Sequence, residues 1–166
     1  MPTDPASLDD PIDDIGAGTE ADPQLIVELW FPVPVGERFE LLMCRRVPRL
    51  GGFWHGISGR VESVHGTLRA AALREMDEEL QLDHARIVTM IDLEQRYDFE
   101  TLRGGWFFRK HCFAVELVEG TTPDHVTLSE EHDDVQMMTF EQAIDVARFP
   151  EYVRELESLE ARLYAR

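Results

Sequence analysis

The segment Leu73–Leu82 constrains the fold and the chemistry of this chain more than any other part of the sequence. Read as a helix, it places Glu75, Glu78 and Glu79 at positions i, i+3 and i+4, so their carboxylates share one face. Apolar residues repeat at the same spacing on another face: Leu73, Met76 and Leu80. Carboxylates this close repel one another unless a cation neutralises them, so the pattern indicates a divalent-metal site. The alternative is an acidic helix face that is only solvated.

The residues around this helix resemble the signature of the Nudix hydrolase family, G-x5-E-x7-R-E-U-x-E-E-x-G-U, where U is a bulky aliphatic residue. Arg74–Glu79 matches the central R-E-U-x-E-E, and Leu82 matches the final U. Counted from Gly59, the first glutamate falls on His65, and the stretch up to the arginine is one residue too long. The glycine of the signature is Gln81, so we expect the left-handed stop of the helix to be missing. The signature is therefore degenerate, although its helical carboxylates are intact.

Residues that precede the helix narrow the resemblance. The match consists of Arg45-Arg46, Phe53-Trp54, Ser58-Gly59 and Val61-Glu62. It is similar to the branch that includes bacterial dihydroneopterin triphosphate and deoxyadenosine triphosphate pyrophosphohydrolases. The whole resemblance covers residues 24–150 and implies an α+β fold, the Nudix α/β/α sandwich with a central mixed sheet.

The hydrophobic pattern places the elements without help from the family. Strands are expected at 24–35, 39–45, 88–97, 106–117 and 135–138, with a hairpin joining the first two. Helices are expected at 67–82, capped by Thr67, and at 140–147 and 152–164. Arg109 and Lys110 interrupt the 106–117 strand, so we expect them to reach an edge or a ligand.

The resemblance implies a reaction and assigns roles to residues. The reaction is Mg²⁺- or Mn²⁺-dependent attack of water on a pyrophosphate linkage in a nucleoside triphosphate or other nucleoside diphosphate derivative. The implied metal ligands are Glu75, Glu78, Glu79 and the backbone carbonyl of Ser58. Arg74 would orient Glu75. Glu131, which lies before a histidine, would complete the metal site or act as a base, and the alternative is an acidic surface loop.

Arginines and aromatic residues before the helix are candidates for binding the substrate. They are Arg45, Arg46, Arg60, Phe53 and Trp54. Arginine forks suit phosphate oxygens and aromatic rings suit a base, but Phe53 and Trp54 equally suit a core beneath the loop. His65 in place of glutamate favours a second hypothesis, a Nudix-fold protein that binds a nucleotide with weak or no catalysis. Isomerase chemistry on an isoprenoid diphosphate has no support from the residues.

Net charge, length and cysteine content predict the class of partner, the domain organisation and the location of the protein. The net charge of −17 argues against general nucleic-acid binding, and acids and bases balance only in residues 38–110. We expect one domain at 23–166 and a disordered or loosely attached acidic tail at 1–22. With two distant cysteines and no long apolar run, we expect a cytoplasmic protein with reduced thiols and no membrane span. A homodimer and the identity of the nucleotide stay open.

Overall fold

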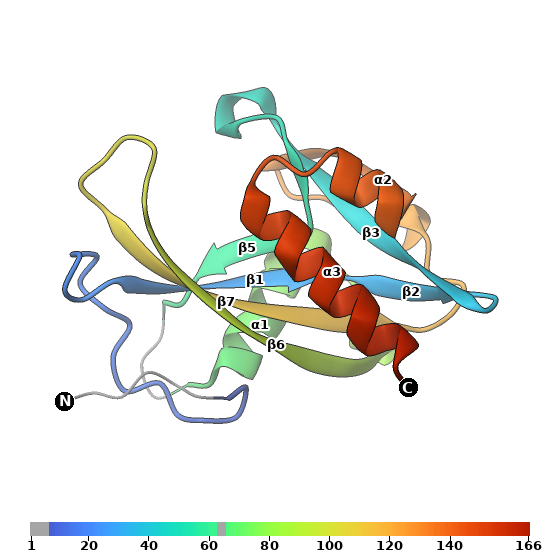
Figure 1. Cartoon of the computed structure of the whole chain (residues 1–166), viewed down its shortest axis with the longest axis horizontal. Helices are drawn as coiled ribbons and strands as arrows, with labels where there is room; N and C mark the ends of the chain where they lie inside the picture. The colour runs from blue at the N-terminus through green and yellow to red at the C-terminus, as the bar shows by residue number, and fades with distance from the viewer. Residues whose placement is uncertain (1–6, 63–65) are drawn as a thin grey trace.

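Two four-stranded sheets form the framework of the computed structural model, which describes residues 7–62 and 66–166 (Figure 1). The first sheet has the order β5-β1-β7-β6, with β1 (Gln24–Trp30) parallel to β7 (Phe107–Leu117) and the other pairs antiparallel. Its outer strands are β5 (Ile57–Arg60) and β6 (Ile87–Glu100). A mixed sheet with flanking helices confirms the expected α+β class.

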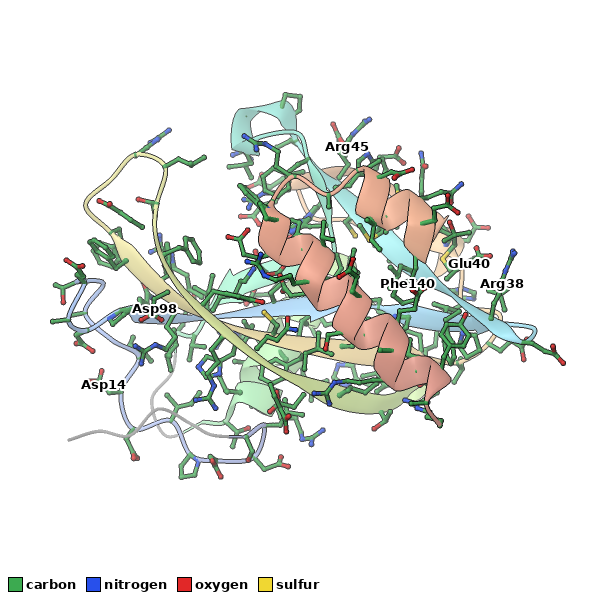
Figure 2. The ribbon with its side chains drawn as sticks, in the orientation of Figure 1. Asp14, Arg38, Glu40, Arg45, Asp98 and Phe140 are labelled. Atoms are coloured by element: carbon green, nitrogen blue, oxygen red, sulfur yellow. The ribbon has the colours of Figure 1, made fainter. Side chains whose placement is uncertain are left out.

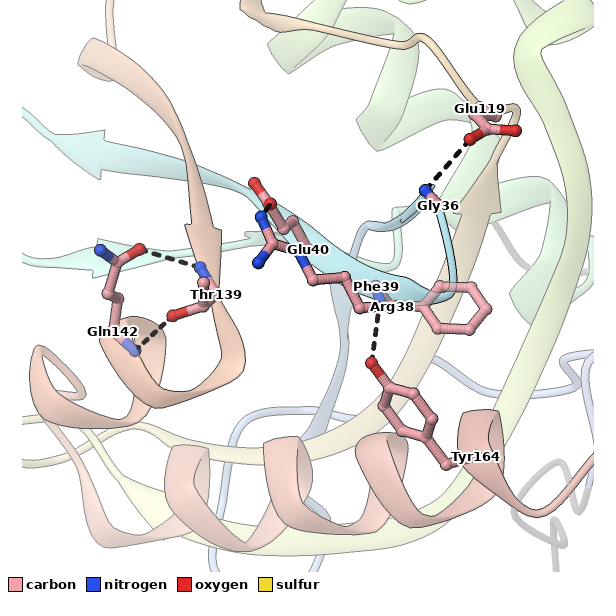
Figure 3. Close-up of polar contacts among 8 residues, drawn as sticks. All are labelled: Gly36, Arg38, Phe39, Glu40, Glu119, Thr139, Gln142 and Tyr164. Atoms are coloured by element: carbon pink, nitrogen blue, oxygen red, sulfur yellow. Dashed lines mark hydrogen bonds and ion pairs between the residues drawn. The ribbon is translucent and has the colours of Figure 1, made fainter.

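The second sheet contains the predicted hairpin of β2 (Pro32–Val35) and β3 (Arg38–Arg46). The short strand β4 (Trp54–His55) and the strand β8 (His132–Thr139) pair with opposite sides of β3. Two contacts fasten the hairpin to distant segments: the Gly36 N–H donates to Glu119, and the Phe39 N–H donates to the Tyr164 hydroxyl (Figure 3). We expected one strand from 24 to 35, but the chain changes sheets at Phe31.

Helices cover both faces of the first sheet (Figure 1). Helix α1 (Leu68–Leu80) begins at Thr67, whose side chain accepts from the Ala70 N–H as expected. Val27 and Leu29 on β1 belong to the core cluster that contains α1, whereas Trp30 belongs to the cluster that contains α3 (Pro150–Tyr164). This division follows from the alternation of side chains along a strand. Helix α2 (Phe140–Asp145), begun by a Thr139–Gln142 capping box, packs on the second sheet (Figure 3).

The end of α1 differs from the expectation. Gln81 adopts φ 48° and ψ 38°, and its N–H donates to the Asp77 carbonyl. The left-handed stop that we expected to be missing is therefore present, formed by a residue with a side chain instead of by glycine. This conformation costs a non-glycine residue about 1–2 kcal/mol.

The expectation of a loose N-terminal tail does not fit residues 7–22. Leu8 and Ile12 are buried and join the core cluster beneath α1. The Leu8 carbonyl accepts from the Arg69 N–H at 3.0 Å, and Asp9 pairs with the Arg69 side chain at 2.7 Å. These two apolar side chains, spaced four apart in an acidic stretch, and the contacts to Arg69 anchor the segment across the start of the helix.

The remaining expectations concern strand ends, thiols and membrane spans. Strand β6 runs to Glu100, three residues beyond its predicted end, and the turn to β7 occupies residues 101–106. Cys44 and Cys112 are buried free thiols, as expected. Within residues 7–62 and 66–166, no helix has the length and apolarity needed to cross a membrane.

Candidate active site

Glu75 lies inside the protein, with its carboxylate against the backbone of β5. A Cβ atom on Gly59 would come within 1.9 Å of Glu75 Cδ, so any other residue at position 59 would displace the carboxylate. Only 5% of Glu75 is exposed. Burial and the charge of Glu78 raise the pKa of Glu75 to about 7, although Arg74 opposes the shift. Glu75 thus occupies a position where its negative charge is poorly compensated.

Glu79, one turn further along α1, is buried but well partnered. Its Oε2 accepts a 2.5 Å hydrogen bond from Ser129 Oγ and lies 3.2 Å from His132 Nδ1. Burial acts to raise the pKa of Glu79, but the hydrogen bonds from His132 and Ser129 outweigh it and hold the pKa below its ordinary value. The Ser129 N–H also donates to the Glu79 carbonyl, which fastens the loop before β8 to the end of the helix.

Arg74 and Glu78 complete the helical part of the site. Arg74 Nη2 lies 3.7 Å from Glu75 Oε1, and Arg74 Nε lies 3.8 Å from Glu78 Oε1. The same guanidinium donates to the Arg60 carbonyl at 3.1 Å, which ties the helix to β5. The Glu78 side chain is 53% exposed. Of the three helical carboxylates, Glu75 and Glu79 are therefore buried and Glu78 reaches solvent.

Glu131 approaches this group from the loop before β8. Burial and the charge of Glu79 raise the pKa of Glu131, while Arg46 opposes the shift. The Glu131 N–H donates to Ser129 Oγ, and its carbonyl accepts from the Val47 N–H at 2.9 Å. The structure thus brings Glu131 next to Glu79, although 52 residues separate them in the sequence.

Sequence reasoning missed two buried histidines at this site. His132 contacts Glu79, and its Nε2 lies 2.9 Å from Nε2 of His55. The two rings stack with their centroids 5.1 Å apart and an interplanar angle of 28°. Burial and the neighbouring His132 hold the pKa of His55 well below its ordinary value. No local pattern could reveal this pair, because 77 residues separate its members and strand pairing alone brings them together.

The arginines proposed to bind substrate are each stacked on an aromatic ring. Arg45 lies over Trp54 and Arg46 over Phe53, each with 5.6 Å to the ring centroid. Arg45, at the upper end of β3 in Figure 2 and away from the hairpin tip, also pairs with Asp133 at 2.8 Å. Of these two arginines, Arg46 is the one that acts on the pKa of Glu131.

Arg60 and Phe53, which were also predicted to bind substrate, contact aromatic rings. The Arg60 guanidinium lies 5.1 Å from the ring centroid of Phe108 and 5.8 Å from that of Trp106. Phe53 makes edge contacts with Phe149 and His55, each at 5.4 Å, so it belongs at least in part to the core. His65 lies outside the described residues.

The donor set suits a hard divalent cation. Helix α1 supplies Glu75, Glu78 and Glu79, the loop before β8 supplies Glu131, and Ser58 precedes Gly59 on the adjoining strand. Carboxylate and carbonyl oxygens are the ligands that Mg²⁺ and Mn²⁺ prefer. The raised pKa of Glu75 marks a carboxylate that an added cation would stabilise in its charged form. The residues present therefore fit a divalent metal.

Comparisons with known proteins bear on the family and the fold of this chain. A family model described as the NUDIX domain matches residues 27–159. An octanoyltransferase from Myxococcus xanthus is 33% identical over 114 residues, which are 66% of this chain but 29% of that protein. The chain thus spans less than a third of the length of this curated relative.

Many solved structures are similar to this chain, among them two hydrolases. An Ap4A hydrolase from C. elegans, solved as a binary complex, has 20% sequence identity and a TM-score of 0.70, with 86% of this chain and 98% of that chain covered. The E. coli dihydroneopterin triphosphate pyrophosphohydrolase has 19% identity and a TM-score of 0.67, with 83% and 95% covered. At such identities the likeness is one of fold.

Proposed function

This chain belongs to the Nudix family and has its fold, and from that premise we propose that it hydrolyses a pyrophosphate linkage with Mg²⁺ or Mn²⁺. The substrate class is a nucleoside triphosphate or another nucleoside diphosphate derivative. The observation that carries the proposal is the pair of buried carboxylates, Glu75 and Glu79, beside the exposed Glu78. Octanoyl transfer is not carried over, because the match covers under a third of the protein that bears that name.

The residues of the chain would divide the work as follows. Glu75, Glu78 and Glu79, with the Ser58 carbonyl, hold the cation, which neutralises phosphate oxygens and lowers the pKa of bound water. Arg74 keeps Glu75 oriented through its bridge to β5. Glu131 suits the role of a base, because its raised pKa brings its proton affinity nearer to neutral pH.

The substrate would be held by arginines and aromatic rings. Arg46 lowers the pKa of Glu131, and Arg45 and Arg60 would add further positive charge for phosphate oxygens. Stacking on aromatic rings limits the rotation of each guanidinium, which suits fixed contacts to phosphate oxygens. Trp54, at the strand that precedes Ser58, is a candidate for contact with a base.

A test combines a substrate screen with one substitution. Nucleotide substrates are incubated with Mg²⁺ or Mn²⁺, and released phosphate and pyrophosphate are measured. Glu79→Gln should lower the rate on the best substrate by more than about 100-fold, because it removes a ligand charge. Asp77→Asn is the matched control, since Asp77 lies on the same helix but pairs with the exposed His84. A Glu79→Gln protein that hydrolyses at the parent rate would refute the proposed site.

The degenerate signature supports a second candidate, a nucleotide-binding protein with weak or no catalysis. His65 stands where the family has a glutamate that adds negative charge near the cation. A variant with His65→Glu and Gly66 deleted restores the family spacing. Faster hydrolysis by this variant than by the parent would favour the second candidate, whereas equal rates and parallel pH profiles would mean that position 65 does not limit catalysis.

A further inference from the structure

Three buried side chains and the half-buried Ser129 form a continuous polar network at the side of the proposed metal site. The network runs from Ser129 to Glu79 and through His132 to His55. His55, His132 and Glu79 are 1%, 6% and 7% exposed. Buried polar groups are costly unless each finds a partner, so a network of this length needs a reason beyond filling the core.

Strand register brings the two histidines to the same face. On β3, Cys44 pairs with His55 of β4, and Arg46 pairs with His132 of β8. Positions two apart on a strand point to the same side, and so do residues directly opposite one another. The β3–β8 register shifts between Arg45 and Arg46, so that His132 and not Asp133 lies opposite Arg46. Without this shift, the His132 ring would point to the other face, away from α1.

The contacts select one arrangement of protons for a neutral pair. Because Nε2 of His55 and Nε2 of His132 are 2.9 Å apart, one of them donates and the other accepts. His132 Nδ1 lies 3.2 Å from Glu79 Oε2, and beside a carboxylate oxygen a protonated nitrogen is attracted whereas a lone pair is repelled. A neutral His132 with its proton on Nδ1 has Nε2 unprotonated, so the proton between the rings belongs to His55. His55 thereby fixes the tautomer of His132 that can donate to the carboxylate.

We propose that His132, held by His55, is a positioning residue that sets the rotation of the Glu79 carboxylate for cation binding. Ser129 and His132 both converge on Oε2, so the protein holds this oxygen, and Oε1 is the oxygen that would face a cation, with Glu131 beside the same carboxylate. The inference rests on the proposed function in one respect, that Glu79 is a metal ligand. Partners of this kind typically change metal affinity by about 10–100-fold when removed.

The test measures Mn²⁺ binding to the metal-free protein by electron paramagnetic resonance, without any substrate. His132→Leu should weaken binding by about 10–100-fold, because it removes a donor to Oε2. His132→Asn should recover most of the loss, because its side-chain N–H can take the place of the Nδ1 donor. His55→Phe keeps a stacking ring but cannot fix the tautomer, so its loss should be intermediate.

The matched control is His84→Asn. His84 also contacts a carboxylate of α1, with Nε2 2.6 Å from Asp77 Oδ1, but it lies on the exposed side of the helix. Its substitution should leave Mn²⁺ affinity unchanged. Circular dichroism confirms that each variant is folded before titration. If His132→Leu fails to fold, Ser129→Ala removes the other donor to Oε2 and should also weaken binding.

The outcomes distinguish a failure of the positioning role of His132 from a failure of the proposed metal-dependent function. If the parent binds Mn²⁺ and the folded His132, His55 and Ser129 variants bind it equally well, the positioning role is overturned and the metal site stands. An equal loss in His84→Asn would likewise overturn the inference, because the effect would not be specific to the network. If the parent itself does not bind Mn²⁺, the proposed function fails and the inference falls with it.

Discussion

Two clusters of buried glutamates lie on opposite sides of the first sheet, and they are neutralised in different ways. On the α1 side, Glu75 lies 3.7 Å from the Arg74 guanidinium, which it shares with Glu78, and Glu79 is held by Ser129 and His132. On the α3 side, Glu28 and Glu155 share Lys110, whose Nζ contacts Glu28 and lies 3.2 Å from Glu155. The second cluster carries its own cation, whereas the first would receive one from solution.

The α3-side cluster surrounds its internal cation with carboxylates and aromatic rings. Trp30 Nε1 donates to Glu155 at 3.4 Å, and the rings of Tyr97 and Tyr152 lie 5.4 and 5.0 Å from Lys110 Nζ. Burial acts to lower the pKa of Lys110, but the two glutamates raise it above its ordinary value. Glu28, Glu155 and Cys112 also have ligand atoms within 4.8 Å of one another, but the ammonium already serves as their cation.

The comparison teaches that burial of carboxylates does not by itself mark an active site. What distinguishes the α1 side is access to solvent: Glu78 is exposed beside Glu75, whose pKa is raised to about 7. On the α3 side, burial and Glu155 raise the pKa of Glu28 to about 8 despite Lys110, but the residues of that cluster are closed off from solvent. The predictions below test this distinction.

The largest effect is expected for Lys110→Met. Removing the internal cation leaves buried glutamates unpaired, which should lower the free energy of unfolding by about 3–5 kcal/mol. Chemical denaturation at neutral pH measures it. Arg109→Met is the control on the same strand, because its partner Asp98 and its own guanidinium are partly exposed and such pairs contribute about 0–1 kcal/mol. Similar losses for both variants would mean that the α3-side cluster is no more dependent on its cation than a surface pair.

Addition of Mg²⁺ or Mn²⁺ should stabilise the protein through the glutamates on the α1 side and not through those on the α3 side. A ligand at 100 times its dissociation constant adds about 2.7 kcal/mol to the native state, seen as a rise in melting temperature. Glu79→Gln should abolish this rise, whereas Glu28→Gln should leave it intact, because Glu28 belongs to the cluster with its own cation. A melting curve that does not move across a metal titration would contradict the site on α1.

Much of the fold could be predicted from the sequence, because its signals are local. The carboxylates at i, i+3 and i+4 and the cap residue Thr67 predicted the position of α1, and the alternation of apolar residues predicted most of the strands. The burial of Glu79 could not be predicted, since it depends on a loop 50 residues away whose Ser129 donates to it. Lys110 was expected to reach an edge or a ligand and instead lies inside, because its partners come from a parallel strand and the last helix.

A smaller effect concerns pH. In the metal-free protein Glu75 titrates near pH 7 instead of near its ordinary value of 4.5. Between these two values the native state binds more protons than the unfolded state, so stability falls as the pH rises through this window. Glu75→Gln should remove the part of this pH dependence that Glu75 causes, and it should raise the free energy of unfolding at pH 8 by about 1–2 kcal/mol. This gain is smaller than the full shift in the pKa of Glu75 implies, because the neighbouring Glu78 is solvated.

The control for this pH prediction is Glu28. Because the pKa of Glu28 is raised to about 8, Glu28 also makes stability fall as the pH rises, and this fall extends further toward alkaline pH. Glu75→Gln should leave the contribution of Glu28 unchanged. Urea denaturation at several pH values separates the two contributions. If Glu75→Gln has no effect on stability at pH 8, the charge of Glu75 is already compensated within the protein, and the contrast between the two sides is lost.

The smallest effect separates strain in α1 from the charge that it carries. Gln81 holds a left-handed conformation at the end of the helix, and glycine adopts that conformation without a clash of its side chain. Gln81→Gly should therefore stabilise the protein by about 1 kcal/mol, reduced somewhat by the greater freedom of glycine in the unfolded chain. The gain should be the same at pH 5 and pH 8 and with or without Mg²⁺, because Gln81 bears no charge. A gain that grew with pH would mean that the end of the helix relieves the repulsion among its glutamates, and that backbone strain and charge on the α1 side are coupled.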